Sequence, residues 1–319
     1  MLILGSYFHK LSYRCCVEIK KYIISVVLSL LIATNVGSQD LKETASGKIA
    51  AFTDSQINAF SNQISENIAS FAKDHFENMK YLDFTIDTQE YLKPTFSIMS
   101  VNEIMKLDSG TIFNQTSINT HDGDQTVNIG LGNRKLIKND TVILGSNIFL
   151  DYQANEQHLR NGFGLEAISS VFDLRGNYYN AISGFKTTDD GREKALDGHD
   201  VQLNYHLFGK ANTDIFLNKF EWTNPNSSFK VKGEKLGINS KIGRLQYDLG
   251  YLNDNKNSDG FFASLNFVVP LGEETKKPQQ RNKALQYVSV RDKLYIPVQR
   301  ENKIKVVKIS KSGVQVSGF

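Results

Sequence analysis

Apolar and polar side chains alternate strictly in two segments near the middle of the chain, Asn128–Arg134 and Gly145–Tyr152. A period of two predicts β-strands, in which successive side chains point to opposite faces of a sheet. One face of each segment is aliphatic or aromatic, and the other consists of glycine, amide and charged residues. In a soluble sheet the apolar face would pack on a core. In a transmembrane barrel it would face lipid, and the polar face would line the lumen.

The same alternation returns downstream at 162–167, 201–207, 245–251 and 261–269. Stretches rich in aspartate, asparagine and glycine lie between these segments, for example Asp189–Gly191 and Asn253–Gly260. Strands of about ten residues joined by such turns predict an antiparallel meander. Residues 82–271 have room for about 12 strands, an even number that suits a closed bacterial barrel. We therefore expect an all-β fold, a transmembrane antiparallel β-barrel at 82–271.

The composition agrees with this expectation without deciding it. The chain is 40% hydrophobic with a mean hydropathy of −0.33, as expected when half of each barrel strand is polar. Thirteen tyrosines and twenty phenylalanines can supply the aromatic girdles of a barrel, although a soluble core could also use them. A net charge of +3 is too small to indicate nucleic acid as a partner.

Residues 1–38 predict a secretory signal peptide. A Lys-Lys pair precedes the apolar run Tyr22–Ala33, and small residues before Gln39 suit a signal peptidase. The run of about twelve residues is too short to span about 30 Å of hydrocarbon. Both cysteines, Cys15 and Cys16, lie before the run, so the mature chain would contain no thiol.

Residues 39–81 predict a periplasmic helical segment. Between Asp54 and Lys80, apolar residues recur at steps of three and four, which is typical of an amphipathic helix. This helix either mediates oligomerisation, including a homodimer, or packs against the periplasmic rim of the barrel. We favour packing against the rim.

The face opposite the apolar one collects charged residues that we expect to form a polar network in the lumen, with Glu221 as a further candidate. These residues are Arg134, Asp151, Glu166, Arg175, Asp200 and Asp248. Opposite charges on neighbouring strands can pair, so we expect Glu166 and Asp151 to pair with Arg134 or Arg175.

No motif predicts catalysis, a metal or a cofactor. The Gly-x-Gly pairs at 130–132 and 162–164 lack the third glycine of a dinucleotide loop and are expected to make room in the lumen or to allow the strands to coil. Asn255–Gly260 resembles a calcium loop, but the position of the bidentate glutamate is Asn266, inside a predicted strand. His199 and His206 have no Gly-x-Ser nucleophile nearby. We expect no catalytic residue and no enzyme activity.

These segments resemble the translocator domain of inverse autotransporters, the intimin and invasin family. Ordered matches lie at 112–115, 128–134, 145–152, 160–167 and 176–185, and Asp197–Asp200 corresponds to a usual Asn-Gly-Tyr-Asp element. Beyond the barrel, Pro297–Ile304 resembles the family's Val-x-Arg-Glu-Asn-x-Ile segment. The residues that carry the motif are Asn128, Gly130, Gly132, Asn147, Asp151, Gly162, Gly164, Glu166, Arg300, Glu301 and Asn302.

The resemblance implies a barrel of the bacterial outer membrane that serves type V secretion, with an exported passenger after the barrel. It implies outer-membrane lipid, the barrel-assembly machinery and periplasmic chaperones as partners, and cell adhesion as the role of typical relatives. Residues 272–319 would form a lumen-threading linker and the start of a passenger, which we expect to be truncated or missing. We expect 272–288 in the lumen, with Lys276, Lys277 and Arg281 against its acidic residues, and 291–319 at the surface.

Two other interpretations stay open from the residues alone. One is a stand-alone, porin-like outer-membrane barrel that acts through its pore or its loops. The other is a soluble exported β-protein or a barrel enzyme.

Overall fold

The computed structural model describes residues 78–90, 92–121, 123–188, 191–207, 213–224, 227–256, 259–271, 283–310 and 313–317. The predicted signal peptide and the predicted helix up to residue 77 lie outside these residues. The prediction that the helix extends to Lys80 is wrong at its end. Met79 and Lys80 belong to the first strand, where Met79 pairs with Asn102 of the next strand.

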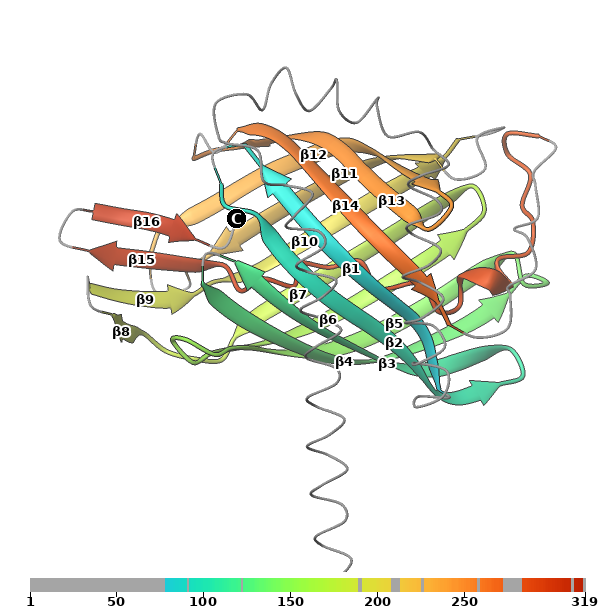
Figure 1. Ribbon diagram of the computed structural model, residues 1–319, viewed down its shortest axis with the longest axis horizontal. Coiled ribbons are helices and arrows are strands. Elements are labelled where there is room, and N and C mark those ends of the chain that lie inside the picture. Colours follow the sequence, from blue (N-terminus) through green and yellow to red (C-terminus); the bar gives the residue numbers. More distant parts are fainter. Residues whose placement is uncertain are drawn as a thin grey trace, which may run out of the picture. The chain divides into compact units, whose positions relative to one another are not determined.

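Within the described residues, twelve antiparallel strands form one closed barrel, which confirms the predicted fold class (Figure 1). The sheet closes because β1 pairs with β14 along Tyr81–Gln89. The barrel strands are β1 (Met79–Gln89), β2 (Thr95–Leu107), β3 (Gly110–His121), β4 (Asp124–Ile137), β5 (Val142–Gln153), β6 (His158–Ser169), β7 (Phe172–Ala181), β10 (Asp197–His206), β11 (Thr213–Thr223), β12 (Lys230–Ile242), β13 (Leu245–Asp254) and β14 (Gly260–Pro270). No helix in the described part of the chain is both long and apolar enough to cross a bilayer.

The two ends of the barrel differ in the length of their connections. One end has short turns such as 108–109, 170–171 and 243–244, and β1 begins and β14 ends there. We call it the turn end. The opposite end, the loop end, carries the long connection 182–196 between β7 and β10. Bacterial membrane barrels place short turns in the periplasm and long loops outside the cell.

Side chains alternate between an outer face and the lumen along each strand, as the sequence predicts. In β4, Ile129 and Leu131 expose 53% and 49% of their surface, whereas Asn128 and Arg134 are fully buried. Exposed aliphatic and aromatic residues continue around the outside on β5, β6, β7, β10 and β13. A continuous apolar surface of this kind suits contact with lipid chains and is unfavourable in water.

Glu221 is a correction to the predicted lumen network. It is half-buried on the outer face of β11 and pairs with Lys230 at 2.8 Å. Phe220 and Trp222, on either side of it in sequence, point inward, as Phe216 does earlier on the strand. The prediction failed because aromatic residues occupy lumen positions on this strand.

Six glycines that face the lumen lie directly opposite aromatic residues of the neighbouring strand. A Cβ on any of these glycines would meet the partner's ring at 2.2–2.7 Å. Each ring therefore covers the backbone where a side chain is missing, the arrangement known as aromatic rescue. The pairs are Gly130–Phe149, Gly132–Phe113, Gly198–Trp222, Gly233–Phe220, Gly237–Phe216 and Gly250–Phe262.

A second sheet of four strands, in the order β16-β15-β9-β8, includes part of the long connection at the loop end. β8 (Lys186–Thr188) and β9 (Gly191–Ala195) form a hairpin within that connection. β15 (Val306–Ser310) and β16 (Gly313–Ser317) come from the chain that follows the barrel, after a short 3-10 helix, η1 (Arg291–Lys293). Figure 1 shows the two pairs of strands side by side.

The orientation of the strands predicts a large difference between outward and inward substitutions. Replacing outward-facing Leu249 with Arg should destabilise the barrel by about 2–4 kcal/mol, because the charge must lie in hydrocarbon near mid-bilayer. Replacing inward-facing Gln246 with Arg should cost far less. The free energy of unfolding in lipid vesicles, measured by urea titration, tests this difference. Equal costs for Leu249→Arg and Gln246→Arg would contradict the orientation.

The aromatic cover of the glycines predicts a second, local effect. Gly132→Ala should destabilise the barrel by about 1–3 kcal/mol, because the new methyl group overlaps the Phe113 ring. The cost should fall when Phe113 is also replaced by Ala, since the two changes act on one contact. Gly184→Ala is the matched control, because a Cβ there meets no atom within 4 Å. The same unfolding titration measures Gly132→Ala, Phe113→Ala, the double variant and Gly184→Ala. An undiminished cost of Gly132→Ala in the Phe113→Ala background would refute the contact.

Candidate functional site in the barrel lumen

The chain after the barrel returns through the lumen from one end to the other. At the turn end, the Val290 N–H donates to the Asp140 carbonyl oxygen at 2.8 Å, and Arg291 pairs with the Asp140 carboxylate. At the loop end, the Lys305 carbonyl oxygen accepts from the Leu196 N–H at 2.9 Å. Residues 294–305 lie between these points and form no helix or strand. We call them the lumen tail.

Barrel side chains satisfy the backbone of the lumen tail near the turn end. Arg134 Nη1 donates to the carbonyl oxygens of Leu294 and Ile296, at 2.8 and 2.5 Å. The Gln115 amide binds Val298 twice: its oxygen accepts from the Val298 N–H at 2.7 Å, and its Nε2 donates to the Val298 carbonyl at 3.4 Å. The Gln115 side chain thus replaces a neighbouring strand for this residue.

The same pattern continues toward the loop end. Arg160 donates to the carbonyl oxygens of Glu301 and Lys303, at 2.7 and 3.0 Å. Asn128 donates to the carbonyl of Asn302 at 2.9 Å, and Asn177 donates to that of Gln299 at 3.0 Å. Irregular backbone at membrane depth is tolerated only where the protein or water satisfies its polar groups. The lumen tail meets this condition through side chains of β3, β4, β6 and β7.

Asp151 on β5 is the centre of the charged contacts. Its carboxylate accepts two hydrogen bonds from Arg300 of the lumen tail, at 2.8 and 2.7 Å, one from Arg160 at 2.8 Å and one from Asn128 at 2.7 Å. The side chains of Asp151, Arg160 and Arg300 are at most 1% exposed. A paired, bidentate geometry of this kind is what makes buried charge tolerable.

The rings that cover glycines also contact the guanidinium groups of the arginines in this network. Arg300 lies 4.2 Å from the ring of Phe149, and Arg134 lies 4.7 Å from that of Phe113. Arg160 lies 4.6 Å from the ring of Tyr179 and 5.8 Å from that of Trp222. A flat ring over a glycine leaves space for a guanidinium and attracts it through the electrons of its face.

Gly162 makes room for the lumen tail itself. A Cβ at this position would lie 3.1 Å from Arg300 Nη2, closer than ordinary van der Waals contact. Gly164 similarly admits the amides of Asn147 and Asn177, which a Cβ would approach to 2.6 and 2.7 Å. The two glycines therefore fit the role in clearing space that the sequence suggests.

Tyr179 links the lumen tail to Asp200. The Glu301 N–H donates to Tyr179 Oη at 2.7 Å, and the Tyr179 hydroxyl donates to Asp200 Oδ2 at 2.7 Å. Asn177 donates to the other oxygen of Asp200 at 2.9 Å. The Glu301 carboxylate pairs with Lys305 at 3.1 Å, within the lumen tail.

The structure brings some of the predicted pairs together and separates others. Arg134 binds Glu166 at 2.6 Å, and Arg175 lies 3.9 Å from Glu166 and 3.0 Å from Asp173. The expected pairing of Asp151 with Arg134 or Arg175 is wrong. Asp151 lies directly across the β5–β6 ladder from Arg160 and pairs with that arginine instead. Asp248 accepts a hydrogen bond from Asn239, away from the lumen tail.

Gln115, Arg160, Asn177 and Tyr179 hold the lumen tail. They lie within the segments that resemble the family, at 112–115, 160–167 and 176–185, but are absent from the predicted lumen network. The signal that could have found them is the period of two. Arg160, for example, lies two residues before Gly162 on the same face of β6, and Tyr179 lies four residues after Arg175 on β7.

The predicted path of the chain after the barrel is also corrected by the structure. Residues from 291 onward are predicted at the surface, yet 294–305 bind the lumen wall. Residues 272–282, and with them Lys276, Lys277 and Arg281, lie outside the described residues. Composition could not locate the segment, because 272–288 and 294–305 are both polar and charged.

Two histidines of the barrel interior are held by neighbouring polar side chains, and His158 binds the Ser183 hydroxyl at 3.0 Å and the Glu193 carboxylate at 2.9 Å. The part of the chain that the structure describes holds no group of three His, Cys, Asp or Glu able to bind a metal ion. His206 pairs with Asp173 and Asp214, at 3.0 and 2.5 Å, and contacts Lys293 at 2.9 Å. These partners of His206 are charged side chains at the turn end.

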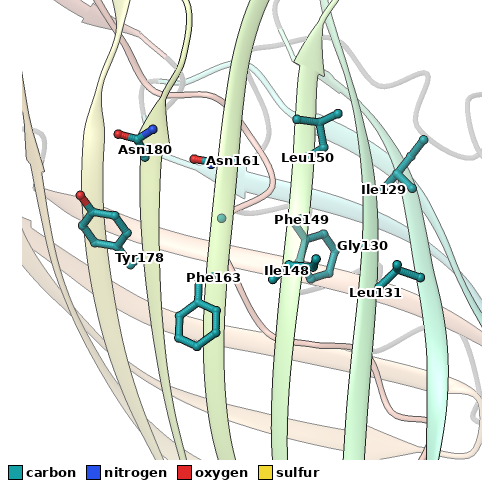
Figure 2. A pocket seen from close by; sticks show the side chains of 11 residues that line it. Ile129, Gly130, Leu131, Ile148, Phe149, Leu150, Asn161, Phe163, Tyr178 and Asn180 are labelled. Atoms are coloured by element: carbon teal, nitrogen blue, oxygen red, sulfur yellow. The ribbon is translucent and has the colours of Figure 1, made fainter.

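The outer face is hollowed over β4–β7, as Figure 2 shows. Apolar side chains such as Ile129, Ile148 and Phe163 line this depression, and Asn161 and Asn180 face each other across the β6–β7 ladder at its edge. It opens on the apolar outside of the barrel, where acyl chains would fill it, and not into the lumen.

The contacts of Asp151 predict which substitutions destabilise the barrel most. Asp151→Ala should cost about 3–5 kcal/mol, because it leaves Arg160 and Arg300 buried beside each other without their anion. Arg300→Ala should cost less, since Asp151 keeps Arg160. Arg291→Ala, which removes a half-exposed ion pair, is the matched control and should cost under about 1 kcal/mol. Unfolding titrations give the three values, and a smaller loss for Asp151→Ala than for Arg300→Ala would reverse the account.

Comparison with known proteins identifies the family. The family model described as inverse autotransporter, beta-domain, matches residues 31–302. A protein of Escherichia coli (strain K12), described as a putative attaching and effacing protein homolog, is 29% identical over 114 residues. Those residues are 35% of this chain and 38% of the relative, so the match spans well under two thirds of that protein.

Solved structures resemble this chain to different degrees, and a TM-score above 0.5 supports a shared fold. One, described as "Unveiling the Mechanism Behind the in-meso Crystallization of Membrane Proteins", has a TM-score of 0.62 at 18% identity and covers 74% of this chain and 100% of its own. The KdgM porin has a TM-score of 0.44 at 7% identity and covers 60% of this chain and 99% of its own. The family match includes every strand of the barrel and most of the lumen tail. The chain therefore belongs to the inverse autotransporter β-domain family, and its barrel is a translocator of the bacterial outer membrane.

Proposed function

We propose that this barrel exports a passenger joined to the C-terminal side of its lumen tail and then anchors that passenger at the cell surface. The observation that carries the proposal is the return of the chain through its own barrel. The lumen tail begins beside the Asp140 turn and ends beside Leu196 at the loop end. With the turn end in the periplasm, the chain after Lys305 lies outside the cell.

Anchoring follows from the contacts of the lumen tail. The Asp151–Arg300 pair and the hydrogen bonds from Gln115, Arg134 and Arg160 hold the tail at a fixed register. Withdrawal of the tail would leave these buried polar groups without partners until water replaced the tail. The passenger would thus stay attached through a non-covalent plug as well as through the chain itself.

A porin-like role is the alternative, and the same contacts count against it. A barrel of this size leaves space that its own side chains do not fill. A porin keeps that space open to water, whereas here a chain segment lies in it and binds side chains of β2 to β7 and of β10. A catalytic role is not part of the proposal: the contacts of His206 with Asp173, Asp214 and Lys293 hold the turn end together.

Family membership supports further partners, which remain part of the proposal. We include the barrel-assembly machinery and periplasmic chaperones, which an outer-membrane barrel of this family would need for insertion. A homodimer through the predicted N-terminal helix stays a prediction, as does an adhesive role of the passenger.

Export can be tested with a passenger of known fold. A small immunoglobulin-like domain with an epitope tag, fused after Phe319, should become sensitive to external protease on intact cells. A matched chain with the same tag inserted between Asp108 and Ser109, in a periplasmic turn, should be cleaved only after the outer membrane is permeabilised. A fused tag that stays protected on intact cells, while the barrel is correctly inserted, would contradict export.

A further inference from the structure

The chain that leaves the lumen does not enter solvent freely, because it adds directly to a strand of the barrel's own connection. All five residues of β15 pair antiparallel with the five residues of β9, from Val306–Ala195 to Ser310–Gly191. β16 then pairs with the opposite edge of β15. Without the tail, β9 would present an unpaired edge to the outside of the cell, which is a template for strand addition.

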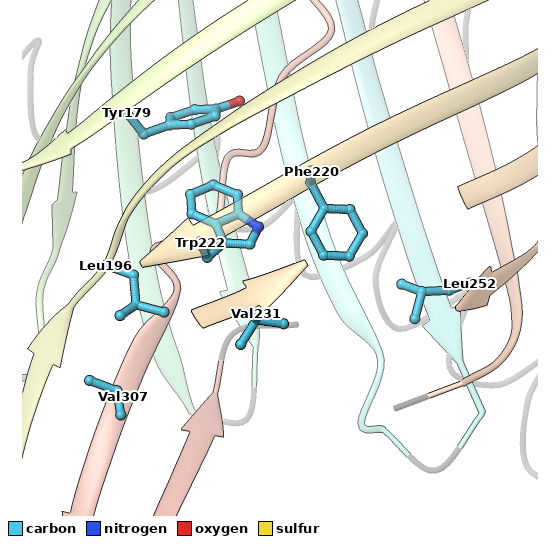
Figure 3. Close-up of a cluster of buried hydrophobic side chains, with 7 residues drawn as sticks. All are labelled: Tyr179, Leu196, Phe220, Trp222, Val231, Leu252 and Val307. Atoms are coloured by element: carbon cyan, nitrogen blue, oxygen red, sulfur yellow. The ribbon is translucent and has the colours of Figure 1, made fainter. Parts of the chain in front are cut away.

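Apolar packing fixes where this addition starts. Val307 is 1% exposed and packs in a cluster with Leu196 and the aromatic residues Tyr179, Phe220 and Trp222 at the loop end of the barrel (Figure 3). Its neighbours Ile304 and Val306 pack against Ala195, the last residue of β9. Side chains on both faces of this first segment outside the lumen are therefore packed against the barrel and its long connection.

A charged contact adds specificity to the pairing. Lys308 lies 3.5 Å from Glu193, its registered partner on β9, and Glu193 also binds His158 at 2.9 Å. Burial alone would raise the pKa of Glu193, but the hydrogen bond from His158 and the charge of Lys308 hold the pKa below its ordinary value. Glu193 therefore presents a negative charge to the basic residue of the arriving strand.

We propose that the β8–β9 hairpin is a folding acceptor: it captures residues 306–310 as they emerge and offers the new β15 edge to the passenger that follows. This inference deepens the proposed function and rests on it. Recognition through backbone hydrogen bonds accepts many sequences, while the Val307 and Glu193 contacts fix the register. Each strand added outside opposes return of the chain into the lumen, so the acceptor speeds export.

The ladder shows which backbone groups to remove. The Leu196 N–H donates to the Lys305 carbonyl, and hydrogen-bonded pairs alternate along an antiparallel ladder. Arg192–Ile309 is therefore a hydrogen-bonded pair, and the Arg192 N–H points to β15. Thr187 lies opposite Arg192 on β8, so the Thr187 N–H points away from β9, toward the open edge.

The test compares two prolines on the same hairpin in the chain fused to the tagged domain. Arg192→Pro removes a donor to β15 and should slow the appearance of the protease-accessible tag by at least about five-fold, the effect of one lost hydrogen bond. Thr187→Pro removes no bond of this ladder and should leave the rate unchanged. Arg192→Ala controls for the contact of Arg192 with the Phe185 ring. Pulse-labelling with protease addition to intact cells measures the rate.

A slower rate in Arg192→Pro could also come from a misfolded hairpin, so a second variant changes β15 instead of β9. Ile309→Pro removes the β15 donor of the same pair and leaves every barrel residue unaltered, so it should slow export like Arg192→Pro. If the tag appears at the unaltered rate in both Arg192→Pro and Ile309→Pro, the acceptor role is overturned while export stands. If the tag never appears even in the unaltered chain, the proposed function itself fails.

Discussion

The need to satisfy backbone polar groups in the absence of water determines this structure. In the barrel wall, closure of β1 on β14 meets that need, because it leaves no strand edge exposed to lipid. The lumen tail has no such ladder, and the amide of Gln115 and the guanidinium groups of Arg134 and Arg160 take its place. Each of these side chains binds main-chain atoms of the tail, so its contact fixes the path of the tail without depending on the side chains there.

Glycine, ring and arginine act together as one unit in the lumen wall. Gly130 lets the Phe149 ring lie flat across the ladder, and the ring then supports Arg300. Gly132 and Phe113 support Arg134 in the same way. The glycines of the family motif thus serve the binding of the tail, since a bulkier residue would lift the ring into the space that the tail occupies.

Period-two alternation was sufficient to predict the barrel, because lipid on one side and a polar lumen on the other impose it on every strand. The same signal failed at Glu221, since β11 turns Phe220 and Trp222 inward to cover Gly233 and Gly198. Polarity alone therefore does not assign a face where rings compensate for glycines. The partner of Asp151 was missed for a different reason, because it depends on the register that places Arg160 opposite it. The register of the lumen tail leaves no periodic signal, as side chain to backbone contacts recur at irregular intervals.

The central claim is that the lumen tail occupies the pore and is held there by the barrel wall. Single-channel conductance in planar bilayers tests it most directly, by comparison of the intact chain with one that ends at Leu271. We expect low conductance for the intact chain and a large, stable increase once the segment containing residues 294–305 is removed. Equal conductance of the two chains would contradict it, because the lumen tail would then not occupy the pore.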